Sequence, residues 1–400
     1  MNQFFSSSLG VTILLMAFCA VAQTTAQKSE VDGGYEDIAK VLDLGPPQQG
    51  PDFAMVTPDE GGMRKLISRW PEDLVIAPIP GRSPTFGWTL AIGGGYFMET
   101  SGPDSDSPPS ALGGFTWFAE NGSYAYGGGV NLHLSDDRFR VKMGAAYADL
   151  RYRYYGIGDA NDLGISIDIL QNGPTFFASG SWRAWKKLYL GLGYLSGDVD
   201  TSVRLGIEEP DGFFDPSLNV RIGGIMVPIR WDSRDHEQFP TSGWLVTGRS
   251  VLYRKDAGSD FDAETITLAA NSYHSVRDRD VIALRAYART TSGDAPFFLL
   301  STFGGSKDLR GYPSGRYRDR MMYTLQGEYR WQINEKWIAT GFAGFGEVAE
   351  SAKEFGNEFL PAAGVGARFV ISQKHRVSLS LDYAIGKDGS ELYVGVGEAF

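Results

Sequence analysis

The sequence is poor in cysteine and has no long apolar run beyond its first residues. Cys19 is the only cysteine in 400 residues, so no disulfide can form within the chain. After Ala22 the sequence contains no apolar run of about 18 residues, the length that marks a membrane-spanning helix. The remainder is therefore secreted, periplasmic or a membrane barrel built from strands.

Positive charge is also scarce. The 37 Lys and Arg residues are outnumbered by 48 Asp and Glu residues, which gives a net charge of -11. Nucleic-acid binding needs a basic stripe that neutralises phosphates. The composition therefore disfavours a nucleic-acid partner.

Marks of catalysis are missing as well. There is no Gly-x-Ser-x-Gly motif and no His or carboxylate cluster at metal-ligand spacing. Asp232, Arg234 and Asp235 form the most polar local set, and a solvated turn explains them better than an active site. We therefore expect no enzyme activity, no catalytic residue, no metal and no cofactor.

Aromatic residues and glycine are abundant instead. The chain has 19 Tyr, 24 Phe, 9 Trp and 51 Gly residues. In a membrane β-barrel, aromatic residues form girdles at both membrane interfaces and glycine serves bends and bulges. The hydrophobic content of 42% also fits a barrel, because only alternate residues of each strand face lipid.

Strand-like alternation follows from Thr85 onward. In residues 281–291, 321–331 and 375–385, an apolar face alternates with a face that carries Arg, Glu, Asp, Ser or Thr. A soluble sandwich has the same period, but repeated charges on one face and a broad, aromatic opposite face favour a polar lumen with lipid outside. The sequence therefore predicts an all-β fold, a transmembrane antiparallel β-barrel of about sixteen strands.

Connections between these strands differ in length. Tight turns fit at residues 136–137, 184–187, 334–335 and 373–374. Longer, more polar loops fit around residues 101–110, 207–217 and 292–319. Because membrane barrels have short turns on one side and long loops on the other, we expect the long loops to share the extracellular end.

The N-terminal part differs in composition from the rest. Residues 9–22 are apolar and end in Ala20-Val21-Ala22, which predicts a secretory signal peptide over residues 1–22. A lipoprotein signal has a small residue before its cysteine. Phe18 precedes Cys19 here, which disfavours a lipoprotein. Residues 23–83 are rich in Pro, Gly and acidic residues and predict a periplasmic linker or plug segment. We expect the barrel domain over residues 84–400.

The chain ends in an alternating strand over residues 392–400. Leu392, Val394, Val396 and Phe400 share one face by this alternation. A terminal Phe that closes such a strand resembles the signal by which outer-membrane barrels are recognised for insertion. We therefore expect Val394, Val396 and Phe400 to form a C-terminal insertion signal.

Three further stretches resemble one family, the BamA/TamA superfamily, also called the bacterial surface antigen family. Residues 229–235 carry Asp232, Arg234 and Asp235, and a turn with Pro240 and Gly243 follows. Residues 303–312 end in Arg-Gly-Tyr, and residues 326–330 are Gln-Gly-Glu-Tyr-Arg. The resemblance covers roughly residues 76–400 and implies that the loop with the Arg-Gly-Tyr tip folds back into the lumen.

The residue types suggest how that loop would be held. A buried Arg needs a carboxylate partner, and its planar fork binds one through two hydrogen bonds. Glu328 faces the lumen by alternation, so we expect it to pair with Arg310, while Gly311 permits a sharp turn and Tyr312 packs on the wall. The family's second partner is an Asp on the next strand, where this chain has Gly344. The alternative is that Arg310 is an exposed loop cation.

The resemblance also implies a function. Family members act in insertion or translocation of proteins or lipids at the outer membrane, helped by a weak seam between the first and last strands. Residues 23–83 are too short and too rich in Pro and Gly for a convincing POTRA module. The implied partners are outer-membrane lipid and lipopolysaccharide, the barrel-assembly machinery, and client outer-membrane proteins or a periplasmic partner. The alternatives are a passive channel or plugged structural barrel, and a lipolytic outer-membrane enzyme.

Overall fold

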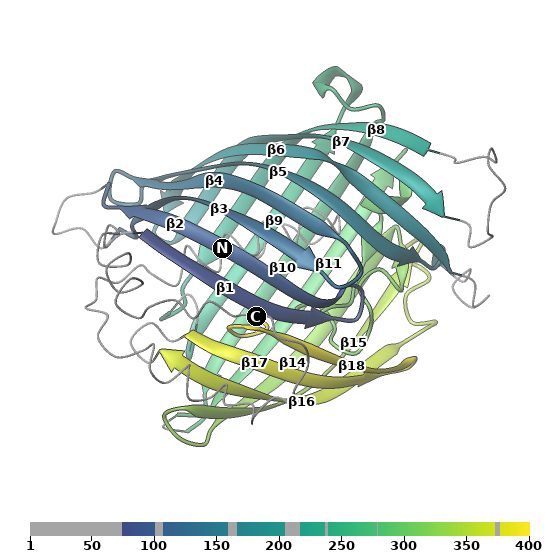
Figure 1. The fold of residues 1–400 in the computed structure, drawn as a ribbon. Coiled ribbons are helices and arrows are strands. Elements are labelled where there is room, and N and C mark those ends of the chain that lie inside the picture. Colours follow the sequence, from purple (N-terminus) through teal and green to yellow (C-terminus); the bar gives the residue numbers. More distant parts are fainter. Residues whose placement is uncertain are drawn as a thin grey trace, which may run out of the picture.

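The protein forms a closed antiparallel β-barrel. A computed structural model describes residues 74–100, 107–158, 166–204, 217–236, 239–277, 279–372 and 377–400. Over these residues sixteen strands close one wall, which confirms the fold class predicted from the sequence (Figure 1). No helix in this part of the chain is long and apolar enough to cross a membrane.

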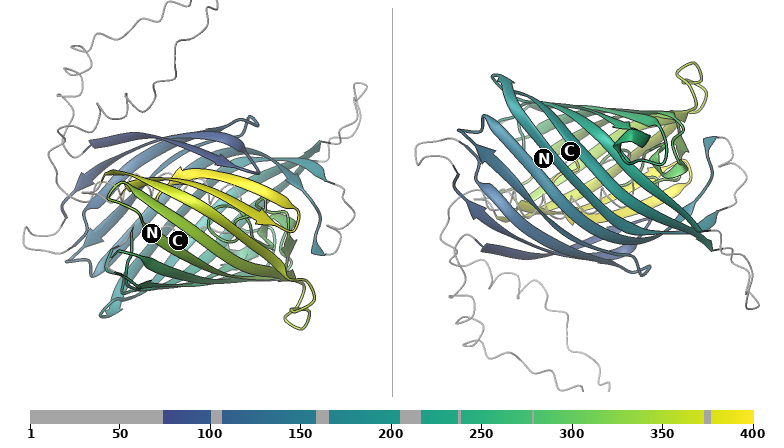
Figure 2. Two further views of the ribbon diagram at one scale, coloured as in Figure 1. Left: turned by 90° about the horizontal axis from the view of Figure 1, so that it is seen from below. Right: turned by 90° about the horizontal axis from the view of Figure 1, so that it is seen from above.

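The strands of the wall follow one another in chain order. They are β1 (Leu74–Ser83), β2 (Gly87–Met98), β3 (Ser110–Ala119), β4 (Tyr124–Leu134), β5 (Phe139–Tyr154), β6 (Ile167–Trp185), β7 (Leu188–Arg204), β8 (Ser217–Asp232), β9 (Gly243–Tyr253), β10 (Ala263–Ser275), β11 (Val281–Gly293), β14 (Met321–Gln332), β15 (Trp337–Ala349), β16 (Leu360–Ser372), β17 (Val377–Gly386) and β18 (Gly389–Val396). Each strand pairs with the next, β11 pairs with β14, and β18 returns to β1 (Figure 2).

The barrel begins earlier than the sequence suggested. Strand β1 covers Leu74–Ser83, ten residues that the sequence analysis assigned to the linker. Pro78, Pro80 and Gly81 interrupt its polarity pattern, and proline is rare inside sheets. The strand forms nonetheless, because its whole length pairs with β2.

One of the three long connections lies at the opposite end of the barrel from the other two. The connection from β2 to β3 is at the end of the barrel where Leu74 lies, which we call the N-terminal end. The tight turns after β4, β6 and β14 lie at this same end. The expectation that the long stretch around residues 101–110 shares the opposite end, the loop end, was therefore wrong. Five strands, β3 to β7, separate it from the connection around residues 207–217, and an odd number of crossings puts the two connections at opposite ends.

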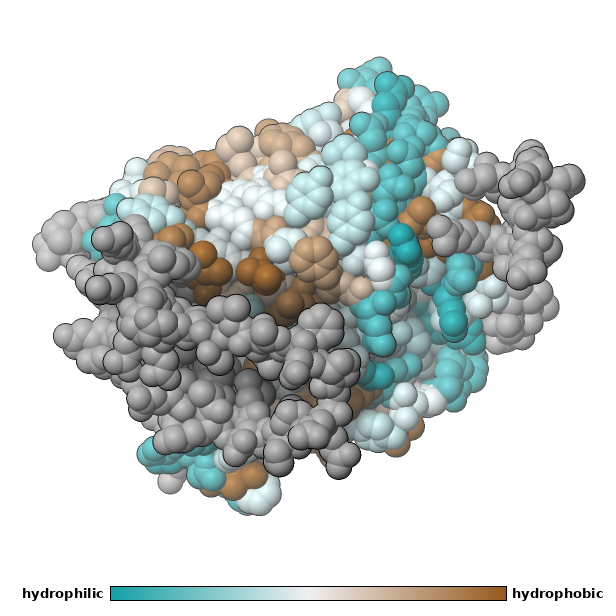
Figure 3. All heavy atoms as spheres, in the orientation of Figure 1, coloured by the Kyte–Doolittle hydropathy of each residue, from teal (hydrophilic) through white to brown (hydrophobic). Residues whose placement is uncertain are grey.

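The outer face of the wall is apolar and aromatic. Exposed large aromatic residues flank the turns at the N-terminal end, namely Phe139, Trp182, Trp185, Trp231, Trp244, Trp331 and Trp337. Trp88 and Phe118 are exposed close to the loop end. Figure 3 shows apolar residues across the wall and a hydrophilic belt toward the loop end. This is the distribution of a barrel whose middle contacts lipid and whose rims contact water.

The lumen holds the opposite kind of side chain. Buried arginines, carboxylates and hydroxyls line the inner faces of β8 to β17, among them Arg230, Arg289, Arg330, Arg368 and Asp382. Buried charges need partners. The lumen is therefore where the fold concentrates its specific polar contacts.

Candidate functional site

The connection between β11 and β14, residues 294–320, folds into the lumen. It contains a short 3-10 helix, η3 (Phe297–Leu299), and a two-residue ladder between β12 (Ser301–Thr302) and β13 (Arg318–Asp319). Phe303, Tyr312 and Tyr317 form an aromatic cluster inside this loop, with ring centroids 5.5 to 5.7 Å apart. We call residues 294–320 the lumen loop.

Arg310 at the loop tip contacts three strands of the wall. Its Nη2 donates to Oε2 of Glu328 on β14 at 2.6 Å. Its Nη1 donates to Oδ2 of Asp382 on β17 at 2.9 Å. The guanidinium also lies 3.4 Å from the ring centroid of Phe342 on β15. Arg310 is 1% exposed, so the structure places it as a buried ion rather than an exposed loop cation.

The second carboxylate comes from an unexpected strand. The family pattern puts an Asp at the position of Gly344 on β15, and a side chain there has no room, since its Cβ would lie 2.5 Å from the carbonyl oxygen of Leu325. Asp382, two strands further along the wall, takes that place. The sequence put Asp382 on the polar face of its strand, but no motif marked it as a partner of Arg310.

Gly311 and Tyr312 fix the conformation of the loop tip. Gly311 has a φ of 114°, in the left-handed region that favours glycine, and a Cβ there would lie 3.0 Å from the carbonyl carbon of Ile385. Its N–H donates to the Tyr393 hydroxyl at 3.0 Å. The Tyr312 hydroxyl donates to the carbonyl of Pro361 at 2.7 Å. The tip is thereby bonded to β16 and β18 as well as to β14 and β17.

Further contacts hold the two flanks of the lumen loop. Asp308 accepts a hydrogen bond from Arg285 of β11 at 2.9 Å. The Tyr317 hydroxyl donates to Asp388 in the β17–β18 turn at 2.8 Å. Burial and this carboxylate raise the pKa of Tyr317, so the hydroxyl stays a donor at neutral pH. The loop is thus anchored on both sides of Arg310.

The Asp-x-Arg-Asp stretch builds the turn between β8 and β9. Asp232 accepts hydrogen bonds from Arg230 at 2.6 Å and from Arg234 at 2.9 Å. Asp235 accepts from the hydroxyl of Thr241 and from backbone N–H groups at 2.9 to 3.1 Å. These carboxylates organise the turn between β8 and β9.

Pro240 and Gly243 lie where that turn joins β9. Pro240 is buried. Gly243 has a φ of 99°, and a Cβ there would lie 2.4 Å from the carbonyl oxygen of Ser233. Only glycine fits this close approach of two backbone segments.

The C-terminal residues do not all lie on one face. Val394 and Val396 belong to β18 and share its outer side, opposite the buried Tyr393. The strand ends at Val396, and Gly397 has a φ of 82°. Phe400 packs inside against Tyr273, Val281 and Ala283 rather than continuing the outer face, so the expected shared face was wrong at this residue. The turn at Gly397 redirects the chain into the lumen.

The seam of the barrel is short. Between β1 and β18 the register contains one pair, Arg82 with Val394. The neighbouring ladder between β1 and β2 contains ten pairs. A side-chain bond from Arg82 Nη1 to the carbonyl of Leu392 at 3.1 Å adds to the seam. The wall is therefore weakest where its first and last strands meet.

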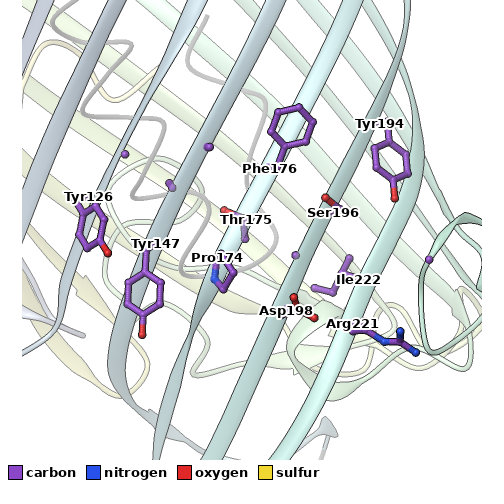
Figure 4. A pocket seen from close by; sticks show the side chains of 15 residues that line it. Tyr126, Tyr147, Pro174, Thr175, Phe176, Tyr194, Ser196, Asp198, Arg221 and Ile222 are labelled. Carbon is purple, nitrogen blue, oxygen red and sulfur yellow. The ribbon is translucent and has the colours of Figure 1, made fainter.

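A groove of about 630 Å³ lies on the wall of β4 to β8 (Figure 4). Tyr126, Tyr147, Phe176 and Tyr194 border it, and Pro174 lies at its centre. Its lining lacks an ordered set of acid, base and nucleophile. Among the described residues no group of three His, Cys, Asp or Glu side chains is arranged to hold a metal ion. The lumen loop and the seam are therefore the candidate functional features.

Comparisons with known proteins agree with this architecture. Residues 224–400 match the Omp85 superfamily domain. BamA from Haemophilus ducreyi, solved without POTRA domains 1-3, has a TM-score of 0.58 at 13% identity, covering 81% of this chain and 70% of that one. No curated protein matches the sequence.

Two structures of CdiB are also similar. CdiB from Escherichia coli has a TM-score of 0.54 at 12% identity, covering 82% of this chain and 63% of that one. CdiB from Acinetobacter baumannii has a TM-score of 0.51 at 12% identity, covering 81% and 59%. This chain therefore spans less than two thirds of each CdiB chain. At these identities the structural likeness shows a shared fold.

Proposed function

We propose that this chain, whose residues 224–400 match the Omp85 superfamily domain, is an outer-membrane β-barrel that inserts or translocates proteins or lipids at that membrane. The observation that carries the proposal is the short seam between β1 and β18. Unpaired N–H and C=O groups at a strand edge are a template for another strand. A barrel that can part at its seam offers that template within the membrane.

The composition of β1 supports a seam that opens. Pro78 and Pro80 lack N–H groups, and they lie two residues apart, so they remove donors from the same side of the strand. The ladder to β2 is complete across both residues, so the missing donors are on the side of β18. The prolines of β1 therefore weaken its pairing with β18.

The lumen loop supports the same function from inside. It ties β14, β16, β17 and β18 together through Arg310, Gly311 and Tyr312. These strands lie on one side of the seam, and β1 lies on the other. Just beyond β1, the Thr85 hydroxyl reaches the loop through one hydrogen bond of 3.5 Å, to the carbonyl of Ser314. The loop therefore ties the last strands of the wall to one another more closely than it ties them to β1.

The partners follow from this proposal. Outer-membrane lipid and lipopolysaccharide would contact the outer wall, and the barrel-assembly machinery would insert the chain itself. We propose that residues 1–22 are a signal peptide and that the segment from residue 23 to the start of β1 is periplasmic. Residues 1–73 lie outside the part of the chain that the structure describes, whereas residues 74–83 form β1. Client outer-membrane proteins or a periplasmic partner would complete the set of partners.

Deletion of the gene tests the proposal in cells. We expect lower amounts of at least one class of outer-membrane protein, or loss of lipid asymmetry, in the deletion strain. A plasmid copy of the wild-type gene should restore both. Unchanged outer-membrane protein levels together with unchanged lipid asymmetry would rule the proposal out.

Two other functions make different predictions. A passive channel would give a large, steady conductance in a planar bilayer, whereas a lumen filled by residues 294–320 should stay mostly closed. A lipolytic enzyme would release fatty acids from lipid in the presence of Ca²⁺. We expect neither activity from the purified barrel, and we infer that it is not an enzyme.

A further inference from the structure

Six charged side chains form a closed ring inside the lumen. Following the contacts around, its members alternate in sign: Arg310, Glu328, Arg330, Glu398, Arg368 and Asp382. We call this set the lumen ring. Every one of these side chains is at most 6% exposed. Four members lie on wall strands, whereas Arg310 is on the lumen loop and Glu398 follows β18.

Glu398 joins the two wall arginines of the ring. Its Oε2 accepts a hydrogen bond from Nε of Arg368 at 3.1 Å and lies 3.5 Å from Nε of Arg330. Arg368 also binds Asp382 at 2.6 Å, and Arg330 also binds Glu328 at 2.8 Å. Each wall arginine is therefore shared between Glu398 and one of the carboxylates that hold the loop.

The backbone brings Glu398 to this position directly from the seam. Gly397, at a φ of 82°, turns the chain inward one residue after β18 ends. Its N–H still donates to the carbonyl of Ser378 at 2.8 Å. The main-chain oxygen of Phe400 accepts a hydrogen bond from Arg330 Nη2 at 2.8 Å. Residues 398–400 thus cross the lumen as a continuation of the seam strand.

Glu398 balances the charge of the lumen ring. With Glu398 in place the ring has three positive and three negative members. Without it, three guanidiniums would share Glu328 and Asp382, and an uncompensated buried charge is costly. Arg330 and Arg368 are fixed to the wall, so they would draw these two carboxylates away from Arg310. Arg310 is the member that can leave, because it is carried by a loop.

We propose that Glu398 is a positioning residue for the lumen loop and that it couples the loop to the seam. It neutralises Arg330 and Arg368, which leaves Glu328 and Asp382 free to hold Arg310. When β18 moves at the seam, Glu398 moves with it, and the grip on Arg310 weakens. Opening of the wall and release of the loop then become one linked event. This inference concerns the state of the loop and does not depend on which client the barrel handles.

Trypsin cleavage of the bond after Arg310 reports release of the loop. Arg310 is buried when the loop is in place, so cleavage tracks the fraction of released molecules. In the folded barrel we expect Glu398→Gln to raise the cleavage rate at this bond by about tenfold or more. Glu398→Asp keeps the charge and should stay close to the parent protein. Mass spectrometry identifies the bond that is cut.

Glu391→Gln is the matched control. Glu391 is also on β18 and partly buried, but it is outside the lumen ring. We expect its cleavage rate to equal that of the parent. If Glu398→Gln also cleaves like the parent while it retains the mobility of a folded barrel, Glu398 does not position the loop.

A disulfide across the seam tests the coupling with Glu398 intact. In a Cys19→Ser background, Arg82→Cys and Val394→Cys would face each other, since directly paired antiparallel residues have the Cα spacing that a disulfide needs. We expect oxidation to slow cleavage after Arg310 and reduction to restore it. The same oxidation should have no effect when Glu398→Gln is added. Equal cleavage of the oxidised and reduced forms with Glu398 present would overturn the coupling, whatever the protein's activity in membranes.

Discussion

An arginine buried in a barrel lumen needs several partners to be stable there. Arg310 has two carboxylates and an aromatic face within contact distance. Such a pair adds little compared with apolar packing, but removal of one member leaves a buried charge without compensation. The contacts of Arg310 with Glu328, Asp382 and Phe342 are therefore specific in geometry and sensitive to single substitutions.

Substitution of Arg310 tests whether these contacts stabilise the folded barrel. We expect Arg310→Ala to lower the stability of the folded barrel by roughly 3 to 5 kcal/mol, because Glu328 and Asp382 lose a cation. The measurement is the urea concentration at which the heat-modifiable folded band disappears. Poor assembly in the membrane should accompany the loss.

Arg316→Ala is the matched control for that measurement. Arg316 is on the same loop and pairs with Asp388 at 3.3 Å, but both side chains are partly exposed. Exposed pairs contribute at most about 1 kcal/mol. An Arg310→Ala protein as stable as Arg316→Ala would show that the ion pairs of Arg310 do not hold the loop.

The sequence allowed one of the two carboxylates to be found. Glu328 lies in a strand with clear alternation, so its inward direction followed from periodicity. Asp382 had the same alternation, but no local rule says which distant strand faces a loop tip. That information comes from the number of strands and from the path of the loop, which are properties of the whole barrel.

Strand β1 differs from the other proline-containing strands in which of its neighbours the prolines affect. Pro174 on β6 and Pro228 on β8 each interrupt the ladder to one neighbour, β7 in both cases. Pro78 and Pro80 interrupt nothing on the side of β2. Their effect falls on the seam, where proline is tolerated because little pairing has to form.

Replacement of both prolines tests the role of β1. We expect Pro78→Thr with Pro80→Thr to extend the ladder to β18, because the pairing of Arg82 with Val394 puts the restored N–H of residue 80 opposite Val396, the last residue of β18. Amide hydrogen exchange should slow in the peptide over residues 389–396. Pro174→Thr restores a donor elsewhere in the wall and should leave that peptide unchanged. Equal exchange in both variants would mean that the prolines do not limit the seam.

The turn between β8 and β9 makes a prediction about pH. Burial opposes ionisation of Asp235, but hydrogen bonds from Thr241, Ser242 and His236 outweigh it and hold the pKa of this carboxyl below its usual range. A depressed folded-state pKa stabilises the protein above the unfolded pKa of about 3.9, and the gain disappears as pH falls through the folded value.

Asp235→Asn should therefore lower the urea midpoint at neutral pH and cost progressively less as the pH approaches the folded-state pKa. The exposed Asp136→Asn at the same end of the barrel is the control, and asparagine tolerates the positive φ of 55° at that position. A difference between the two variants that stays constant from neutral to acidic pH would contradict the role of the Asp235 carboxylate.

Two features were not predicted from the sequence: strand β1 and the inward orientation of Phe400. Strand β1 lacks alternation because of its prolines, and the alternation test therefore placed the barrel's start at residue 84. In the sequence, Phe400 continues the apolar alternation of β18. In the structure, the left-handed turn at Gly397 takes it into the lumen. A period of two predicts faces only as long as the strand continues.

At the scale of the whole molecule, the barrel combines a firm side and a weak side. The lumen loop bonds to β14 through β18, and the seam between β18 and β1 has one register pair. The even strand number, the outer aromatic residues and the polar lumen were all expected from composition and periodicity. The weak seam was implied by the family resemblance alone, because composition and periodicity do not report contacts between residues more than 300 positions apart.

The proposed function requires that the seam between β1 and β18 opens to act on a client within the membrane. Its direct test is the folding rate of an unfolded outer-membrane protein into liposomes that contain the Arg82→Cys, Val394→Cys barrel. We expect rapid folding when the seam disulfide is reduced and the slow rate of empty liposomes when it is oxidised. Equal rates in the two states, or no acceleration over empty liposomes in the reduced state, would contradict it.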